Sequence, residues 1–496
     1  MRYNILFGGQ AGQGPNILGE ILGEALVKQG YYVFYSRDYQ SLIRGGHNFN
    51  VLTFSDSPIH SNDSKIDVLV ALDENTKKIH STKMKKEGII LDGKHENMYF
   101  AGRLFKLLCL DFETLNQELR ELKKKYEENL KNAKLGYEEE TKNICHVKNQ
   151  KNKIYFLNGS KEISQGAIES GLDVYYAYPM TPATPVLREL AEKQIEKNYL
   201  VLEPENEIAV INSAIGSAIT GAKVMIGTSG GGFDLMTEGL SMAGIAGVPL
   251  VVYLAQRPGP ASGVPTYTAQ GDLNIARHAG HGEFPRMVLA PGDPIECREL
   301  TNQAFYFSQK YKIPCIVLND KHLAESFYSL KEIPKIIKSQ KTISLGKFNS
   351  YESTSEGIST EDSKRIEKNN IERLKKVWDI EKEAEKFIQY KNFGKKNSKN
   401  LIVSWGSTKG AILDAIQGLD TEFLQILYME PFPKEILKFL KNKNIILIEN
   451  NATAQLGQLI TEKTGIFIED KNKILRFDGR PFLADELNLE VKKRLN

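Results

Sequence analysis

Five runs of consecutive apolar residues dominate the middle of this sequence, with helical patterns between them. The runs cover residues 174–178, 224–227, 250–255, 287–290 and 313–318. A strand that is apolar at every position must be buried on both faces, which is typical of a parallel sheet between two layers of helices. The pattern therefore predicts an α/β fold whose central domain is a parallel sheet covered by helices on both faces.

Strand and helix signals also alternate at both ends of the chain, so we expect three α/β domains. The N-terminal one combines strand-like residues 4–7, a helical pattern at 17–28 and a buried strand at 66–71. Segments rich in Lys, Glu, Ser and Asn separate the domains, and these predict solvated helices and linkers. The predicted boundaries are an N-terminal α/β domain at 1–115, a helical connector at 116–155, the central domain at 156–330, a polar helical linker at 331–400 and a C-terminal α/β domain at 401–496.

Composition excludes several classes of function. The sequence has 65 Lys and Arg residues against 62 Asp and Glu residues, a formal net charge of +3. So small an excess predicts no nucleic-acid partner and no membrane partner. The start of the chain lacks the pattern of a signal peptide, and no apolar run approaches the roughly 20 residues that cross a bilayer, so we expect a cytoplasmic protein.

Cysteine usage is sparse. The 4 Cys residues are Cys109, Cys145, Cys297 and Cys315, and none of them stands at CxxC spacing. This argues against a disulfide framework, and against a zinc or iron–sulfur site held by this chain alone. We predict no metal site in the chain.

A glycine-rich turn follows the first strand. Gly9, Gly12 and Gly14 lie between a strand and a helix, where backbone amides and the helix dipole suit an anionic group. The spacing GxxGxG matches neither the dinucleotide fingerprint nor a P-loop, so a purely structural tight turn is the alternative. Arg44, in the loop Arg-Gly-Gly-His-Asn, is a candidate to complete the anion site, although this loop would also suit a helix cap.

Prolines fix the loop after the first central strand. In Tyr178-Pro179-Met180-Thr181-Pro182 the prolines restrict φ, so the Thr181 hydroxyl is held in a nearly constant direction. Loops at the carboxyl ends of parallel strands are where such sheets bind ligands. A rigid entry into the next helix is the alternative reading.

Glu207 stands out among three neighbouring acids. Glu203, Glu205 and Glu207 would ordinarily form a solvated helix start, but Glu207 adjoins a helix of small and apolar residues. Its carboxylate is therefore expected to face the interior or an interface. A buried carboxylate must be paired or neutral, and such a group suits proton exchange with a bound heterocycle.

Two further loops carry candidate ligand-binding residues. Ser229 and Gly230 open a glycine loop after the strand at 224–227, where a ligand or partner chain can approach the backbone closely. Arg257 follows the strand at 250–255 and is flanked by Pro258, so its guanidinium suits a carboxylate; a structural ion pair is the alternative. The sequence Gly271-Asp272-Leu273 only approaches the GDG…N pattern of a metal motif.

Several of these segments together resemble the α subunit of the 2-oxoacid:ferredoxin oxidoreductases. The resemblance rests on YPMTPATP, the Glu-Asn-Glu-Ile-Ala stretch, GTSGGGFDLMTEG, QRPGPASGVPT and HGEFPRMVLAPGD. GGQAGQG and RGGHN resemble the γ domain of the same family, fused here ahead of α. The motifs around Trp405, Glu430, Glu449 and Asp478 resemble its second α domain, which is transketolase C-terminal-like.

The resemblance implies an enzyme that decarboxylates a 2-oxoacid oxidatively on thiamine diphosphate, forms an acyl-CoA and passes electrons to ferredoxin. This chain would supply the pyrimidine-binding half of the cofactor site. Mg²⁺ and a 4Fe–4S cluster would lie on a β-type partner subunit, so a hetero-oligomer is expected, active only with both chains. CoA would be a co-substrate.

The resemblance also implies roles for individual residues. Glu207 would contact the aminopyrimidine ring, Thr181 would touch substrate or cofactor, and Arg257 would hold the substrate carboxylate. Tyr178, Pro179, Ser229 and Gly230 are expected around the cofactor. The fused architecture slightly favours 2-oxoglutarate, while pyruvate, branched-chain or aryl 2-oxoacids are alternatives, as is a non-catalytic scaffold subunit that only holds nucleotides.

Overall fold

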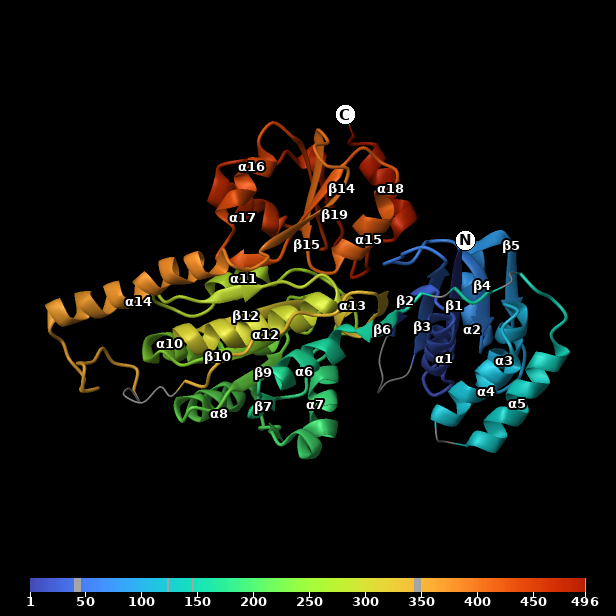
Figure 1. The fold of residues 1–496 in the computed structure, drawn as a ribbon, viewed down its shortest axis with the longest axis horizontal. Coiled ribbons are helices and arrows are strands. Elements are labelled where there is room, and N and C mark those ends of the chain that lie inside the picture. The colour runs from blue at the N-terminus through green and yellow to red at the C-terminus, as the bar shows by residue number, and fades with distance from the viewer. Residues whose placement is uncertain (40–45, 123–124, 145–146, 151, 343–348, 496) are drawn as a thin grey trace. The chain divides into compact units, whose positions relative to one another are not determined.

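The computed structural model describes residues 1–39, 46–122, 125–144, 147–150, 152–342 and 349–495. These residues form two compact units with three β-sheets (Figure 1). The first unit comprises Met1–Leu157, Ser326–Glu332 and Leu483–Asn488, and the second holds the described remainder. The predicted α/β fold class is confirmed.

The sheet of the first unit is mixed. Its strands run in the order β5 (Met84–Leu91), β4 (Ile66–Ala71), β1 (Arg2–Gln10), β3 (His47–Ser55), β2 (Tyr32–Asp38), β13 (Phe327–Leu330) and β6 (Tyr155–Asn158). Strand β1 pairs in parallel with β4 and antiparallel with β3. The helices of this unit are α1 (Pro15–Lys28), α2 (Glu74–His80), α3 (Asn97–Leu107), α4 (Phe112–Glu121) and α5 (Tyr126–Glu139).

The predicted solvated connector at 116–155 is where the structure differs from the sequence analysis. Helices α4 and α5 pack on α3, and Leu115, Leu119 and Ala133 are buried in the core of the first unit. A Cβ atom on Gly102 would lie 1.9 Å from the carbonyl oxygen of Ala133, so the backbones of α3 and α5 touch. Leu119 and Ala133 thus lie on faces that neighbouring helices cover, whereas Leu135 of the same segment is exposed.

The central sheet of the second unit follows the prediction closely. Its order is β17 (Tyr428–Glu430), β11 (Met287–Leu289), β12 (Pro314–Asp320), β10 (Leu250–Gln256), β9 (Val224–Thr228), β7 (Val174–Ala177) and β8 (Leu200–Leu202). Every pair except β17 with β11 is parallel. All five predicted apolar strands are therefore present in one sheet.

Helices cover both faces of this sheet. Alternate residues such as Tyr176, Ile226 and Val252 pack into a core with α8 (Glu207–Ile219), α10 (Thr237–Ala246) and α11 (Leu273–His278). The intervening residues face the other layer, to which α7 (Thr184–Lys197) and α12 (Pro294–Tyr311) belong. Shorter or flanking helices are α6 (Gly159–Glu169), α9 (Gly230–Leu235) and α13 (Lys321–Glu325). Burial of both faces explains why these strands are continuously apolar.

The C-terminal sheet has the order β14 (Tyr390–Gly394), β16 (Glu422–Ile426), β15 (Asn400–Trp405), β18 (Asn444–Glu449) and β19 (Lys473–Leu475). Figure 1 shows α16 (Leu437–Leu440) and α17 (Gln455–Thr464) on one side of it and α15 (Thr408–Ala415) on the other. The remaining helices are α14 (Ser363–Ala384), which is largely exposed, and α18 (Ala484–Lys492). Within the described ranges, none of the helices combines the length and apolar character needed to cross a bilayer.

One strand lies inside the segment predicted to be a polar linker. Strand β14 pairs antiparallel with β16 along its whole length, from Tyr390 to Gly394. Its residues are partly exposed because it is an edge strand, and this exposure accounts for its polar sequence.

Candidate active site

Four loops meet at the carboxyl edge of the central sheet. Strands β10, β9, β7 and β8 are neighbours and run in parallel, so the loops that follow them leave the sheet at the same edge. The loops after β7, β9 and β10 carry Thr181, Ser229 and Arg257, and the one after β8 leads into Glu207. Parallel α/β sheets bind their ligands at this edge.

Glu207 is the first residue of α8. Asn206 caps the helix, its side-chain oxygen accepting a hydrogen bond of 2.9 Å from the backbone N–H of Ala209. The Glu207 residue is only 4% exposed, whereas Glu203 and Glu205 are exposed. Its Oε1 atom is buried and has no hydrogen-bond partner among the described residues. The acid that the sequence singled out is therefore the buried one of the three.

The glycine loop after β9 packs directly on this carboxylate. A Cβ atom at Gly232 would lie 2.6 Å from Glu207 Oε1 and 2.3 Å from Thr228 Oγ1, so only glycine fits there. Ser229 is fully buried, and its hydroxyl likewise lacks a partner in the described part of the chain. The close approach of the loop to Glu207 thus requires glycine at position 232.

Asp272 reaches the same loop. A Cβ atom at Gly230 would lie 2.8 Å from Asp272 Oδ2, an oxygen that is buried and unpartnered by any residue the structure describes. Burial raises the pKa of Asp272 to about 6; the charge of Asp234 adds to this effect and Arg257 opposes it. The backbone N–H of Asp272 donates to Gln256 Oε1 at 3.0 Å, which fixes the residue beside the end of β10.

Arg257 joins two of the loops. Its Nη1 donates a hydrogen bond of 2.7 Å to the backbone carbonyl of Thr181, although the two residues are 76 positions apart in sequence. Its Nε is buried and, in the described chain, unpartnered. Burial lowers the pKa of Arg257, while the nearby carboxylate of Asp272 acts in the opposite direction.

The site therefore contains donors and acceptors that the protein itself leaves unsatisfied. Within the described chain they are Glu207 Oε1, Ser229 Oγ, Asp272 Oδ2 and Arg257 Nε. Buried polar groups nearly always have partners, so several unpaired atoms at one edge of a sheet indicate a place for a polar ligand. Tyr178 and Pro179 are exposed at the rim of the first loop.

Asp272 is the residue that sequence reasoning missed. In the sequence it stands within Gly271-Asp272-Leu273, which approaches a metal motif without completing it and predicts no role for the acid. The informative signal was position: Asp272 follows the Arg257 loop and immediately precedes α11, which places it at the same edge of the sheet.

The predicted N-terminal anion site lies in the first unit. Gly14 caps α1 in the left-handed region, with φ of 80°, and a Cβ atom there would lie 2.3 Å from Asn97 Nδ2. Both features require glycine at position 14 for structural reasons. A structural tight turn is the alternative to an anion site that the sequence leaves open. Gly9 lies near the end of β1 and Gly12 in the turn that follows it, where Gln13 Oε1 accepts from the backbone N–H of Gln10 at 2.7 Å. Arg44 falls outside the described residues.

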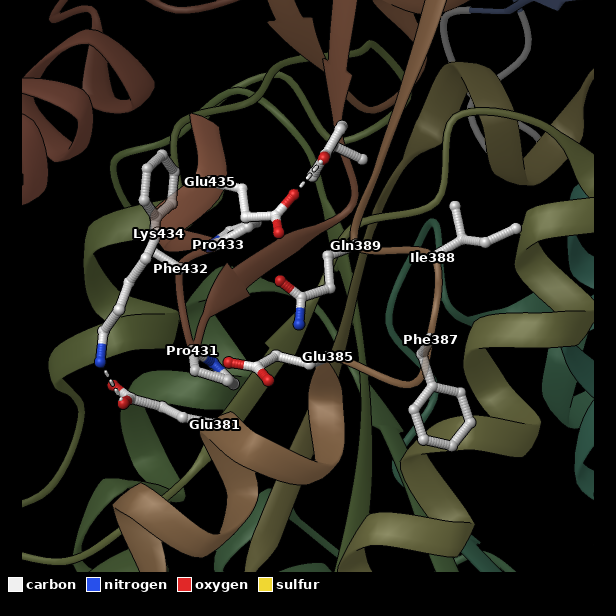
Figure 2. Close-up of a pocket in the computed structure, with 11 residues that line it drawn as sticks. Glu381, Glu385, Phe387, Ile388, Gln389, Pro431, Phe432, Pro433, Lys434 and Glu435 are labelled. Atoms are coloured by element: carbon white, nitrogen blue, oxygen red, sulfur yellow. Dashed lines mark hydrogen bonds and ion pairs between the residues drawn. The ribbon is translucent and has the colours of Figure 1, made fainter. Parts of the chain in front are cut away.

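A separate cavity of about 310 Å³ is lined in part by Pro431, Phe432 and Pro433. Lys434 pairs with Glu381 at 2.6 Å (Figure 2). Glu435 accepts a hydrogen bond of 2.9 Å from the Tyr390 hydroxyl. The predicted catalytic and cofactor residues do not line this cavity. It is thus distinct from the edge of the sheet where the unpaired polar atoms gather.

Comparison with known proteins identifies the family. The model "Pyruvate flavodoxin/ferredoxin oxidoreductase, thiamine diP-bdg" matches residues 165–391, and "Pyruvate ferredoxin/flavodoxin oxidoreductase" matches residues 4–96. The 2-oxoacid:ferredoxin oxidoreductase subunit alpha of a Sulfolobus species is 30% identical, over 98% of this chain and 96% of its own length. The chain belongs to the 2-oxoacid:ferredoxin oxidoreductase α subunits. The family predicted from its motifs is therefore confirmed.

Other members of the 2-oxoacid:ferredoxin oxidoreductases are similar as well. The KorA subunit of 2-oxoglutarate synthase from Archaeoglobus fulgidus is 31% identical over 62% of this chain and 89% of its own length. The structure of 2-oxoglutarate:ferredoxin oxidoreductase from Magnetococcus marinus, with 2-oxoglutarate, coenzyme A and succinyl-CoA bound, has a TM-score of 0.86 over the whole of both chains. At 23% identity that likeness shows the shared fold.

The region matched as thiamine diphosphate-binding contains the whole candidate site. Residues 165–391 include Glu207, Ser229 and Asp272, as well as the Arg257 and Thr181 pair. An α subunit of this family is part of an oxidoreductase, so the predicted enzyme class is confirmed.

Proposed function

We propose that this chain forms the pyrimidine-binding half of the thiamine diphosphate site in a CoA-dependent 2-oxoacid:ferredoxin oxidoreductase. The observation that carries the proposal is the buried Glu207 carboxylate, whose Oε1 has no partner within the described chain and lies against a glycine loop. A carboxyl oxygen in this setting fits a ring nitrogen of an aminopyrimidine. When bound, thiamine diphosphate supplies the electron sink for decarboxylation.

The protein side chains have distinct tasks in this proposal. Glu207 holds or shares a proton at Oε1 with the pyrimidine ring, in a position that excludes water because the residue is only 4% exposed. Ser229 and Gly230 line the approach to it, and Tyr178 and Pro179 form the rim. Gly232 allows the ring to approach because no side chain fills the space in front of the carboxylate.

Arg257 and Thr181 are proposed to receive the substrate. Arg257 uses Nη1 to hold the Thr181 carbonyl, and its buried Nε is left with a hydrogen to donate to a carboxylate oxygen. A planar guanidinium binds carboxylates with two parallel hydrogen bonds, so the group suits the acid end of a 2-oxoacid. The hydrogen bond to Thr181 fixes the orientation of that fork.

We favour 2-oxoglutarate as the oxoacid and CoA as the acyl acceptor. Support comes from the structure from Magnetococcus marinus, which holds 2-oxoglutarate, coenzyme A and succinyl-CoA, and from the relatives named 2-oxoglutarate synthase. Pyruvate is the second candidate because both matching family models carry its name. The turn with Gly9, Gly12 and Gly14, together with Arg44, is the proposed anion site for CoA.

A second chain is part of the proposal. The relatives are named as α subunits, which implies at least one other kind of subunit. We propose a β-type partner that carries Mg²⁺, the pyrophosphate site and a 4Fe–4S cluster, and ferredoxin as the electron acceptor. The sparse, widely spaced cysteines of this chain agree with a cluster held elsewhere. A cytoplasmic location also remains part of the proposal.

The decisive experiment replaces one carboxylate in the assembled enzyme. The chain is reconstituted with its β-type partner, and reduction of a viologen dye is followed with thiamine diphosphate, CoA and 2-oxoglutarate. Glu207→Gln is expected to lower turnover about 10²–10⁴-fold, the usual contribution of an acid–base group. Glu205→Gln is the matched control, because this acid is exposed two residues away, and it should retain wild-type turnover.

Two controls make the result specific. Each variant is checked for an unchanged melting curve, so that loss of folding is not mistaken for loss of chemistry. The assay is also run with each chain alone, and dye reduction should need both. Near-normal turnover in Glu207→Gln would refute the assignment of this carboxylate.

A further inference from the structure

A second cavity lies at the amino ends of the central strands, whereas Glu207 and the candidate active site lie at their carboxyl ends. Its volume is about 360 Å³, and it opens beside the C-terminal end of α10 and beside Lys312, the residue that caps the C-terminal end of α12. Its walls combine backbone from 244–247 with side chains from 352–355 and from α14. The side chains that carry its polar chemistry are Lys312, Glu352, Arg365, Glu372, Arg373 and Lys376.

Cations outnumber acids in this cavity. Among the described residues that line it, the cations are Lys312, Arg365, Arg373 and Lys376, and the acids are Glu352 and Glu372. Glu352 is already engaged, because Arg373 Nη2 donates to its Oε1 at 2.5 Å and Asn369 Nδ2 donates to its Oε2 at 2.8 Å. Glu372 is exposed and lies 3.9 Å from Lys368. Within the described chain these two acids therefore form ion pairs with Lys368 and Arg373, and neither pairs with Lys376.

Lys376 is the most telling of these groups. It is partly buried, and no acid of the described chain forms an ion pair or hydrogen bond with it. Its Nζ lies 3.9 Å from the Cβ position of Gly247 at the cavity wall. Burial lowers its pKa, and the neighbouring charges of Lys312 and Arg373 lower it further. A cation held against two other cations is stabilised when an anion is present between them.

Hydroxyl groups complete a set of donors. Ser353, Thr354 and Ser355 line the same cavity. The Thr354 Oγ1 accepts a hydrogen bond of 3.3 Å from the backbone N–H of Glu356, so its own hydrogen is available for donation. Arg365 is anchored by its Nε to the carbonyl of Ser353 at 3.5 Å. Charged N–H and neutral O–H donors around one space are the groups that bind phosphate oxygens.

We propose that this cavity is a binding site for an oxyanion of the phosphate class, free or carried as the phosphoryl group of a small metabolite, with Lys376 as its central cation. The site is separate from the candidate active site. The cavity lies at the amino end of β10 and Glu207 at the carboxyl edge, and a strand of 7 residues is roughly 20 Å long. The proposal stands whether or not the proposed function is correct.

Binding of inorganic phosphate to the full-length chain tests the proposal. Calorimetric titration at constant ionic strength is expected to show one saturable site, with chloride as the reference salt. Lys376→Gln should weaken phosphate binding about ten- to a hundredfold, since a hydrogen bond to a charged group is lost. Lys375→Gln is the matched control, because it removes the same charge from an exposed neighbour, and it should bind like the wild type.

Further variants and ligands decide the remaining outcomes. Lys376→Arg keeps the charge and should restore much of the affinity, while Arg365→Gln should weaken binding without touching Lys376. Glycerol 3-phosphate is titrated beside inorganic phosphate: tighter binding of the ester assigns the site to a phosphoryl metabolite, and tighter binding of phosphate assigns it to the free anion. Absence of saturable binding by both, or equal affinity in Lys376→Gln and Lys375→Gln, overturns the proposal.

Discussion

At the level of single residues, two carboxylates approach the same glycine loop from different helices. Glu207 comes from the start of α8 and Asp272 from the residue before α11, and each has one buried oxygen that the described chain leaves unpaired. An unpaired buried acid lowers the stability of the folded state. Acids of this kind are typical of binding and catalytic sites, where a ligand supplies the missing partner.

Asp272 gives a prediction about stability and pH. Its folded pKa is about 6 against an ordinary value of 3.8, so between about pH 4 and pH 6 the unfolded chain loses this proton first. Stability therefore falls across that window and is lower by about 3 kcal/mol above it. Asp272→Asn cannot ionise, and urea unfolding should show it to be more stable than the wild type at pH 8 but not at pH 4.

An exposed acid provides the comparison for this measurement. Asp470 has a side chain that is 93% exposed, and Asp470→Asn should change stability little and without such a pH window. If Asp272→Asn changed the free energy of unfolding by the same amount at pH 4 and at pH 8, ionisation of the buried Asp272 carboxyl would not be the cause of that change.

Part of the candidate site was predictable from the sequence and part was not. Glu207 could be recognised because an acid stood at the start of a helix of small residues. The contact of Arg257 with the Thr181 carbonyl could not, because it joins loops that only the sheet order brings together. Asp272 was overlooked for the same reason, since its burial depends on Gly230 in another loop.

At the level of elements, the helix pair α3 and α5 depends on close backbone contact. A Cβ atom on Gly102 would lie 1.9 Å from the Ala133 carbonyl oxygen, closer than any real Cβ contact. We expect Gly102→Ala to lower the free energy of unfolding by about 2–3 kcal/mol, because the helices must move apart. Chemical denaturation of the full chain measures the change.

Gly216 is the control for helix propensity. It lies within α8, and a Cβ atom there would meet nothing within 4 Å. Gly216→Ala should therefore be neutral or stabilising by about 0.5–1 kcal/mol. A Gly102→Ala protein as stable as the Gly216→Ala protein would contradict the proposed contact.

The elements that the sequence predicted best are those whose pattern is local. The five apolar strands of the central sheet needed only their own residues to be recognised. Strand β3 was not predicted, since His47, Asn48 and Asn50 interrupt its apolar residues and its pairing partners β1 and β2 are what define it. Helix α5 was assigned to solvent because it has few apolar residues, and these suffice for packing on α3 since Gly102 and Gly136 let the two backbones approach closely.

At the level of the whole molecule, a buried ionic cluster joins helix α12 to the C-terminal sheet within the second unit. Glu296 accepts hydrogen bonds from Lys409 at 2.6 Å, Lys391 at 2.8 Å and Gln425 at 2.6 Å. Lys409 also pairs with Asp293. Burial raises the pKa of Glu296, but the two lysines more than offset it and hold the pKa well below its ordinary value.

Removing Lys409, the cation that Glu296 and Asp293 share, should lower the free energy of unfolding. Lys409→Met is expected to destabilise the chain by about 3–5 kcal/mol, because the buried acids lose their main partner. Lys395→Met removes an exposed lysine paired with an exposed Asp420 and should leave the melting temperature nearly unchanged. Thermal unfolding of both variants measures the contrast, and equal melting temperatures would rule out a structural role for the cluster.

Strand β17 has a consequence for how the polypeptide can be divided. This short strand comes from the C-terminal part of the sequence, yet it pairs with β11 at the margin of the central sheet. A fragment that stopped before residue 428 would leave the β11 backbone groups uncovered, and an open strand margin is a template for aggregation. A fragment that contains the central sheet must therefore extend past β17, and a shorter one would be insoluble even if the loops around Glu207 could still fold.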